Sequence, residues 1–374
     1  MFLALKELKH GKLRFLMIGT ILVLISWLVF ILSGLGNGLS TLSAASLKGM
    51  DTDYVVYEKG SSNALSKSLL SEDLTTRIKE ENSDVKAAAP IGASMGSVVK
   101  DGEDLDGDKE DVAILGIEPG TFLEPKVIEG SSLSSGEPMK VIANDTLKDA
   151  GFKIGDVLQL DGSTEEMEIA GFVEDQTYNH VTSIYVTMEK WRDYTFAAPG
   201  SDNGIENPVN GIALQGENID AEKLDSQIDG IQTATKKQAI NGMPGYTAEN
   251  GTITMMLVFL LAISAFVIAV FFYVLTLQKS NQFGIMKAIG ASNGFLAKAI
   301  VSQVFTLSLI SILIGIALSY GTAAILPEAM PFNLDTVLVI TYGVVLLIIS
   351  VLSSLLSVRK ITKIDPLTAI GRVE

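Results

Sequence analysis

The hydrophobic positions of this chain gather in four long stretches that contain no charged residue: 15–47, 250–278, 299–327 and 336–358. Each stretch exceeds the roughly 20 residues with which an α-helix crosses about 30 Å of hydrocarbon. Backbone groups in lipid must be satisfied within a helix or a closed barrel, and these apolar runs are unbroken rather than alternating. The pattern therefore predicts four transmembrane helices, which we assign to residues 15–38, 251–278, 299–326 and 336–358.

Basic residues fall on one side of these four spans. Of the 28 Lys and Arg residues, 11 lie outside residues 38–250, and every one is on the same side: Lys6, Lys9, Lys12, Arg14, Lys279, Lys287, Lys298, Arg359, Lys360, Lys363 and Arg372. An excess of Lys and Arg in short loops marks the cytoplasmic side. We therefore expect a multi-pass protein of the plasma membrane with both termini cytoplasmic. Its cytoplasmic parts are an amphipathic helix over 1–14, a loop over 279–298 and a tail over 359–374.

The region between the first two spans has the composition of a soluble domain. Residues 38–250 carry 38 acidic and 17 basic residues, and the short outer loop 327–335 has no basic residue. We assign 39–250 to a stalk and an extracytoplasmic domain. Strand-like alternation occurs at 54–57, 111–117, 157–160, 167–173 and 183–187, and helical periodicity at 71–80, 143–150 and 221–229. The predicted fold class is an α-helical membrane protein with four transmembrane helices plus an α+β extracytoplasmic domain between helices 1 and 2.

Composition excludes several classes of site. The absence of Cys excludes disulfides, thiolate metal sites and thiol catalysis, and a net charge of −15 argues against a nucleic-acid binder. Of the two His residues, His10 is interpreted as a cytoplasmic interfacial residue and His180 as a solvated loop residue. The acidic run 101–111 fails the EF-hand pattern because Lys109 stands where Gly is required. A solvated hairpin tip explains that run better, so no metal site is predicted there.

The sequence gives no positive support for an enzyme. The only Gly-Lys pair, Gly11-Lys12, lacks the upstream Gly of a phosphate-binding P-loop. No Ser-His-Asp set or carboxylate pair stands out, so no catalytic residue is assigned. We expect a protein without a cofactor of its own, and any ATP and Mg²⁺ would be bound by a partner subunit.

One cytoplasmic segment carries a distinctive motif, Gln282-Phe283-Gly284-Ile285-Met286-Lys287-Ala288-Ile289-Gly290-Ala291-Ser292. With the layout of one span, a large outer domain and three further spans, it resembles the coupling helix of FtsX-like or MacB-type permeases of ABC transporters. That family commonly has Glu where this chain has Gln282. The resemblance implies that residues 282–291 couple the chain to an ATPase. The spacing of Phe283, Met286 and Ile289 predicts an apolar ridge on a short helix, beside glycines that allow close approach.

Two further regions resemble the same family. The tail segment 364–370 reads Ile-Asp-Pro-Leu-Thr-Ala-Ile after the basic pair Arg359-Lys360. In the outer domain, 141–144, 155–158 and 169–173 resemble the family's core domain. The resemblance implies a homodimer in the lipid bilayer with two copies of an ABC ATPase subunit, in which the stalks transmit motion to the outer domain. The spans have no charged residue suited to an ion relay, so substrate is expected to come from the outer leaflet or surface.

The segment before the second span gives an indication of the class of substrate. Residues 240–252, with Met255, Met256 and the N-terminal residues 1–10, resemble the haem-exporting permeases of Gram-positive bacteria. The resemblance implies export of haem, with Tyr246, Glu249, Met255 and Met256 as candidate substrate residues. Phenolate, carboxylate and thioether groups can serve haem iron, and no other metal site is assigned. The alternative for these residues is ordinary membrane packing and an interfacial aromatic belt.

Two other functions fit the same layout. One is an ABC permease for resistance to antimicrobial peptides, or for extraction of lipids and lipoproteins. The other is a mechanotransmitting FtsX-like signalling permease that activates a cell-wall hydrolase while nothing crosses the membrane.

Overall fold

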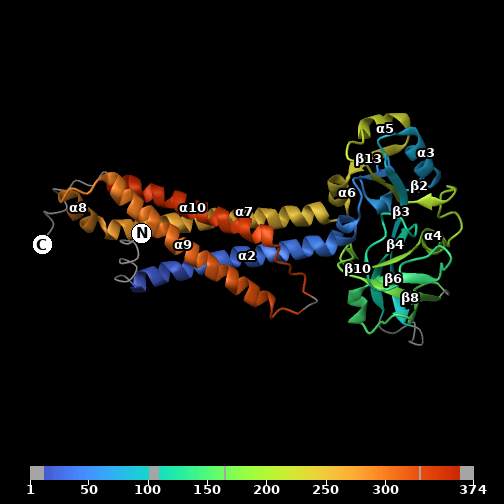
Figure 1. Cartoon of the computed structure of the whole chain (residues 1–374), viewed down its shortest axis with the longest axis horizontal. Coiled ribbons are helices and arrows are strands. Elements are labelled where there is room, and N and C mark those ends of the chain that lie inside the picture. Colours follow the sequence, from blue (N-terminus) through green and yellow to red (C-terminus); the bar gives the residue numbers. More distant parts are fainter. Residues whose placement is uncertain (1–11, 101–108, 164–165, 328–329, 363–374) are drawn as a thin grey trace. The chain divides into compact units, whose positions relative to one another are not determined.

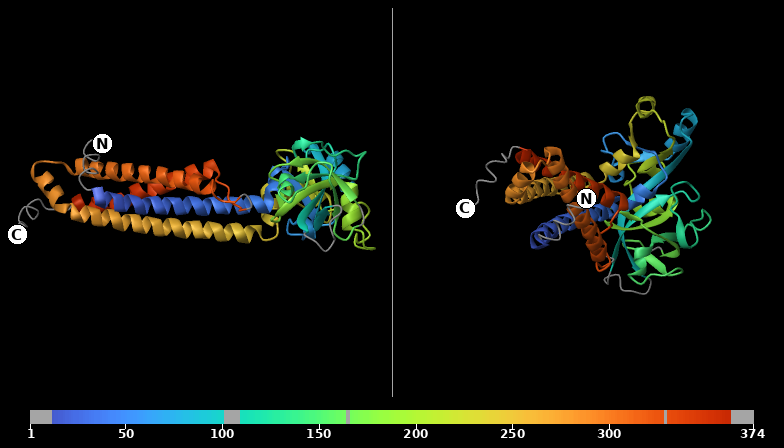
Figure 2. Two further views of the ribbon diagram at one scale, coloured as in Figure 1. Left: turned by 90° about the horizontal axis from the view of Figure 1, so that it is seen from below. Right: turned by 60° about the vertical axis from the view of Figure 1, so that its left-hand side comes forward.

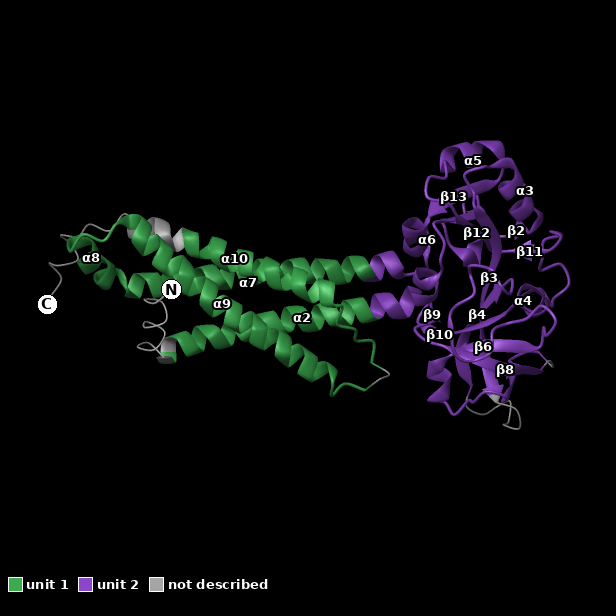
Figure 3. Ribbon diagram, in the orientation of Figure 1, with its two compact units in different colours: residues 1–38, 250–374 green, residues 39–249 purple. Residues whose placement is uncertain are grey.

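The computed structural model describes residues 12–100, 109–163, 166–327 and 330–362, and it divides into two compact units (Figures 1 and 3). Unit 1 comprises 1–38 and 250–374, and unit 2 comprises 39–249. The tip of the acidic run at 101–108, the expected N-terminal helix up to residue 11 and the tail motif 364–370 lie outside the described residues.

Long apolar helices make up unit 1. They are α2 (Lys12–Gly49), α7 (Tyr246–Gln278), α9 (Asn293–Ala323) and α10 (Thr336–Thr362), with the short α8 (Ser280–Ala288) between α7 and α9. All four long helices are long and apolar enough to cross a membrane. All four run past an expected bound: α2 continues to Gly49, α7 begins at Tyr246, α9 begins at Asn293 and α10 ends at Thr362. The extensions of α2 and α7 include residues of unit 2.

Small residues let α2 and α9 approach closely. The Ser26 hydroxyl donates to the carbonyl of Ser311 at 3.4 Å, and the Ser311 hydroxyl donates to the carbonyl of Gly19 at 3.3 Å. A Cβ on Gly315 would lie 2.1 Å from the Ser26 hydroxyl oxygen, so any larger residue would force Ser26 to shift. Interfaces of this kind are typical of helices that pack in lipid, where van der Waals contact replaces the hydrophobic effect. The helix α10 packs along α9 as well, as Figure 2 shows in orange and red.

Unit 2 is built on a mixed sheet whose order is β13-β1-β12-β3-β4-β10-β6-β8-β5, with β7 joining β3 to β8 and β9 paired to β10. Its strands are β1 (Tyr54–Glu58), β3 (Ala87–Lys100), β4 (Glu110–Ile117), β5 (Val127–Gly130), β6 (Lys140–Asn144), β7 (Val157–Leu160), β8 (Glu166–Val173), β9 (Thr177–Tyr178), β10 (Val181–Thr187), β12 (Gly211–Gln215) and β13 (Ile231–Thr235). A small second sheet pairs β2 (Leu70–Ser71) with β11 (Pro208–Val209).

Helices cover both faces of the large sheet. They are α3 (Asp73–Glu81), α4 (Met188–Thr195), α5 (Ala221–Gln227) and α6 (Lys236–Gly242), with 3-10 turns η1 (Leu65–Lys67) and η2 (Asp145–Lys148). One core contains Ile78 of α3, Trp191 of α4 and Leu224 of α5. The other contains Leu47 of α2 and Ala239 of α6. The predicted fold class, four membrane helices with an α+β domain between the first two, is confirmed.

The helix predicted over 143–150 is wrong. Strand β6 runs to Asn144, between β10 and β8, and only the 3-10 turn η2 follows it. Ala143 is fully buried in the sheet, and the Asn144 side chain accepts a hydrogen bond from the Gln176 backbone at 2.9 Å. Pairing with strands distant in sequence therefore outweighs the local helical periodicity.

Candidate functional site

The proposed coupling segment forms the short helix α8 and the turn after it in unit 1. Gly290 closes the turn with a φ of 102°, a left-handed conformation that favours glycine. Ser292 then caps α9, because its hydroxyl accepts a hydrogen bond from the Phe295 backbone at 3.2 Å. The motif therefore specifies where one helix stops and the next begins.

Exposure along this segment corrects the predicted ridge. Phe283 is only 4% exposed and packs with Phe15, Phe272 and Leu296 in the core of unit 1, so it is not part of an outward ridge. Met286 is half-buried against the same cluster. The large apolar side chains that remain exposed are Ile285, Ile289 and Phe295, at 53%, 81% and 53%. Buried Phe283 anchors the segment, and these three side chains form its free apolar surface.

A second candidate site lies in unit 2, where α2 is kinked. Ala44 has non-helical backbone angles, φ −141° and ψ 16°, within the helix. The four carbonyls before it each accept a hydrogen bond from another group. Lys48 Nζ donates to Ser40 at 2.8 Å, and Thr177 Oγ1 to Thr41 at 3.2 Å. The backbone amides of His180 and Asn179 donate to Leu42 and Ser43 at 3.3 and 2.8 Å. These contacts satisfy the carbonyls that a helix end otherwise leaves unpaired.

The β9–β10 hairpin supplies three of the four donors. Its two-residue turn consists of Asn179 and His180, with φ values of 51° and 70°. Two successive left-handed residues are typical of the tight turn that matches the twist of paired strands. Asn and His tolerate this conformation better than most residues. The turn thus aims two backbone amides at the kink, and we call this hairpin with the carbonyls of residues 40–43 the kink clasp.

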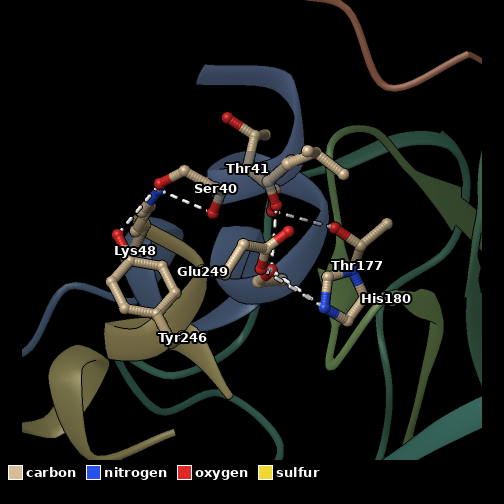
Figure 4. Close-up of polar contacts among 9 residues, drawn as sticks. Ser40, Thr41, Lys48, Thr177, His180, Tyr246 and Glu249 are labelled. Carbon is tan, nitrogen blue, oxygen red and sulfur yellow. Dashed lines mark hydrogen bonds and ion pairs between the residues drawn. The ribbon is translucent and has the colours of Figure 1, made fainter. Parts of the chain in front are cut away.

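Side chains from the first turn of α7 join the kink clasp (Figure 4). The Glu249 carboxylate accepts a hydrogen bond from the Ser43 hydroxyl at 3.0 Å and lies 3.5 Å from His180 Nε2. The Tyr246 hydroxyl lies 2.9 Å from the Ser40 hydroxyl, which also accepts a hydrogen bond from Lys48 at 2.7 Å. The same ammonium stands 5.5 Å from the centre of the Tyr246 ring, within cation–π range.

The structure brings together two of the four substrate candidates. Tyr246 and Glu249 belong to the polar cluster in unit 2, whereas Met255 and Met256 belong to unit 1, as side chains of α7 that are 55% and 42% exposed. Their exposure leaves the thioethers open to lipid or to a ligand.

His180 is the residue of this cluster that sequence reasoning set aside. Its side chain is 43% exposed, in keeping with a loop, yet its ring contacts both Ser43 and Glu249. Asn179, which tolerates the left-handed conformation of turns, is the local turn signal just before the alternation at 183–187. No local pattern signals that this hairpin reaches α2.

The cluster offers donors of the kinds that bind haem iron. Imidazole and phenolate are axial ligands of haem proteins, and a carboxylate is a further oxygen donor. No group of three or more His, Asp or Glu residues suited to a metal ion occurs among the described residues. Beside the turn, burial raises the pKa of the Tyr178 phenol to about 12, so this hydroxyl stays protonated at neutral pH.

Comparison with known proteins covers both halves of the chain. A family model for the FtsX-like permease C-terminal region matches residues 254–366, and one for the MacB-like periplasmic core domain matches residues 15–231, which is more than half of the 374 residues.

Similar full-length proteins include a putative hemin transport system permease protein HrtB of Staphylococcus haemolyticus. It is 27% identical over 374 residues and covers 100% of both chains. An HrtB protein of Staphylococcus epidermidis is 28% identical over 372 residues, 99% of each chain. An uncharacterised ABC transporter permease of Mycobacterium tuberculosis is 23% identical over 375 residues, 99% of each chain.

Among solved structures, the extracellular domain of the noncanonic ABC-type transporter YknZ from Gram-positive bacteria matches at 14% identity. Its TM-score is 0.35, and it covers 49% of this chain and 100% of its own. The periplasmic region of MacB from Actinobacillus actinomycetemcomitans matches at 12% identity and a TM-score of 0.37, covering 51% of this chain and 92% of its own. With the two family matches, the four apolar helices and the domain between the first two, the chain belongs to the FtsX-like, MacB-type permeases of ABC transporters, a multi-pass membrane protein.

Proposed function

We propose that this permease is the membrane subunit of an ABC exporter that removes haem from the plasma membrane. It works as a homodimer with two copies of a separate ATPase, and both of its termini lie in the cytoplasm. The observation that carries the proposal is the side-chain cluster at the start of α7, in which Glu249 contacts His180 and Ser43 and Tyr246 contacts Ser40. Full-length similarity to permeases named for hemin transport supports the same substrate.

Haem chemistry fits the residues at the start of α7. Haem combines a flat apolar ring with anionic propionates and an iron atom that accepts oxygen, nitrogen or sulfur ligands. Glu249 and Tyr246 offer oxygen donors, Met255 and Met256 offer exposed thioethers, and Lys48 supplies a cation beside Tyr246. Because Glu249 already accepts a hydrogen bond from Ser43, binding of iron to this carboxylate would weaken its hold on the kink clasp.

Coupling to ATP hydrolysis is assigned to the exposed apolar surface after α7. Ile285, Ile289 and Phe295 are large, exposed and close in sequence, whereas Phe283 is buried as their anchor. We propose that the ATPase docks on this surface, and that its movement is passed to α7. The continuous helix α7 carries Glu249 in its first turn.

A haem titration of the full chain in lipid nanodiscs tests the substrate assignment. Combining Glu249→Gln with Met255→Leu should weaken haem binding at least about tenfold by the absorbance band, and His180→Ala should weaken it less. The matched control combines Glu217→Gln with Met139→Leu, since both side chains are exposed in unit 2 outside the cluster. An unchanged titration in the first double variant would remove Glu249 and Met255 from the site.

The kink clasp favours mechanical transmission as a second candidate function. Three donors of the β9–β10 hairpin hold the carbonyls of Thr41, Leu42 and Ser43, so a movement of α2 at the kink would be passed directly to the sheet. Two results together would favour mechanical transmission over export. The purified wild-type protein would show no haem absorbance band on titration, and a strain lacking the protein would tolerate haem normally. Peptide or lipid substrates would then be tested by the same strain's sensitivity to membrane-active peptides.

A further inference from the structure

Strand β3 has a stretch of open edge in the middle of the large sheet. On one side β3 pairs with β4 from Ile91 to Val98. On the other side it pairs with β12 only up to Ile91 and with β7 only from Val98 onward. Residues 93–97 therefore pair with a strand on one side and, among the described residues, with no strand on the other, which we call the gap.

Hydrogen bonds at the two ends of the gap show which amides and carbonyls of β3 point into it. The Ala93 amide donates to the Asn210 side chain at 2.8 Å, and the Ser97 carbonyl accepts from the Asp161 amide at 2.9 Å. Odd-numbered residues of β3 thus turn their backbone groups to the gap, and even-numbered ones to β4. Within the described residues, the Ala93 carbonyl, the Met95 amide and carbonyl and the Ser97 amide have no hydrogen-bond partner on the gap side.

A cavity of about 500 Å³ borders this stretch of β3 at Ala93, Ser94 and Met95, whose side chains alternate between the two faces of the sheet. On one face lie Ala93 and Met95, with Met95 46% exposed, and Pro244 is apolar as well. On the other face lie Ser94 and Thr195, whose hydroxyls bond each other at 3.1 Å. A slot reaching both faces in the plane of a sheet has the form of a missing strand, because side chains of a strand alternate between the faces.

We propose that the β3 edge at residues 93–97 binds an extended peptide segment of a partner protein by β-strand addition. The four free backbone groups present donors and acceptors at the spacing of a strand, which another main chain matches and a sugar or lipid does not. Strands β12 and β7 close the two ends, so the slot takes a segment of a few residues. The preferred segment alternates, with apolar side chains toward Met95 and hydroxyl side chains toward Ser94.

The full chain in nanodiscs is tested with a fluorescein-labelled heptapeptide, Thr-Val-Thr-Val-Thr-Val-Thr. In the free protein, residue-resolved hydrogen exchange should be fast at the Met95 and Ser97 amides and slow at Gly96 and Val98, which face β4. Saturable peptide binding should then protect Met95 and Ser97. The same peptide with its three central amides N-methylated should bind at least about tenfold more weakly, since it keeps the side chains and loses the donors.

Two variants give a matched comparison. Met95→Pro removes one amide on the gap side and should weaken binding of the heptapeptide at least about tenfold, whereas Met95→Leu keeps the amide and should bind like the wild type. Haem titration should be the same in both variants, which separates this proposal from the export function.

Three results would overturn the proposal: no saturable binding of the unmodified heptapeptide, equal binding of the N-methylated one, or slow exchange at Met95 and Ser97 in the free protein. Protection of the Met95 and Ser97 amides from hydrogen exchange that increases with protein concentration in the absence of peptide would assign the edge to a second copy of this chain. That result would overturn the peptide assignment.

Discussion

At the scale of single residues, burial and neighbouring charges shift the pKa of several ionisable groups in unit 2. The clearest case is the half-buried acidic pair Glu72 and Glu118 in unit 2. Burial, and then the nearby Glu72, raise the pKa of Glu118 above its ordinary value of 4.5, although Arg192 opposes the shift. Arg192 forms an ion pair with Glu72 at 2.7 Å and cannot compensate both carboxylates fully. The folded protein therefore holds the Glu118 proton more tightly than the unfolded chain does.

This shift predicts a pH-dependent gain in stability for Glu118→Gln. Stability from the bound proton is complete below the ordinary pKa and is lost as pH rises from 4.5 through the raised folded pKa. The variant should therefore have a higher Tm than the wild type at about pH 8, and the difference should shrink at about pH 4.

Tryptophan fluorescence of a Trp27→Phe background, in which buried Trp191 is the remaining tryptophan, reports this unfolding. The control Glu217→Gln changes a side chain that is 82% exposed and should leave Tm unchanged at either pH. A Tm for Glu118→Gln at or below that of the wild type at the higher pH would contradict the argument.

At the scale of elements, packing selects residues that local propensity disfavours. Strand β3 reads Ala-Ala-Ala-Pro-Ile-Gly-Ala-Ser-Met-Gly-Ser-Val-Val-Lys, a composition that is poor for a strand. Its glycines are explained by α4, because the fully buried ring of Trp191 lies against Gly92 of β3 and Gly116 of β4. A bulkier strand residue would occupy the same space as the indole. Strand β3, which lies next to the central strand β4, was therefore among the strands that the sequence patterns failed to predict.

Gly92→Ala should destabilise unit 2. The added Cβ would lie 2.3 Å from Trp191 Cδ2, and a rigid buried ring cannot move aside, so overpacking should cost about 1–3 kcal/mol. Denaturant unfolding of the full chain, followed by Trp fluorescence, should show a lower midpoint. Gly294→Ala in α9 meets nothing within 4 Å and should be neutral or slightly stabilising. Equal unfolding midpoints for the two variants would show that β3 shifts enough to accommodate the added methyl group beside the indole.

At the scale of the whole molecule, one polypeptide joins a lipid-facing helical unit to a water-facing sheet unit through α2 and α7. Each unit carries a candidate interface of its own. Unit 1 exposes the apolar surface of Ile285, Ile289 and Phe295, and unit 2 contains the kink clasp with Glu249. The proposed transport cycle requires both, because in that proposal a separate ATPase supplies the energy at one interface and haem binds at the other.

Placing charge on the coupling surface should release the ATPase. Ile285→Asp with Ile289→Asp puts two carboxylates where the partner is expected to bury apolar surface, so the co-purified ATPase should fall at least about tenfold. The control Ile325→Asp alters a side chain that is 84% exposed near the other end of α9. Gel filtration should show both permeases intact. Undiminished ATPase in the double variant would assign the docking surface to another part of the chain.

Much of this architecture was determined by the sequence alone. The four spans, the acidic domain between the first two and the coupling motif were all predicted, and the fold class and the family are confirmed. Strands β1, β4, β7, β8 and β10 also coincide with predicted alternation. The spans can be predicted from the sequence because each apolar run satisfies the requirements for crossing hydrocarbon by itself. Its length covers the bilayer, and its backbone hydrogen bonds form within its own helix.

Only the tertiary structure decided which side chains meet. Ser43 contacts His180 at a separation of 137 residues and Glu249 at 206, and no local periodicity reports such pairs. The burial of Phe283 and the glycines of β3 likewise depend on what packs against them, namely the core of unit 1 and Trp191. In the sequence, a hydrophobic residue that packs in the core looks the same as one that is exposed and free to bind another protein. The contacts made by distant parts of the chain settle which of the two it does, because burial depends on the surrounding fold.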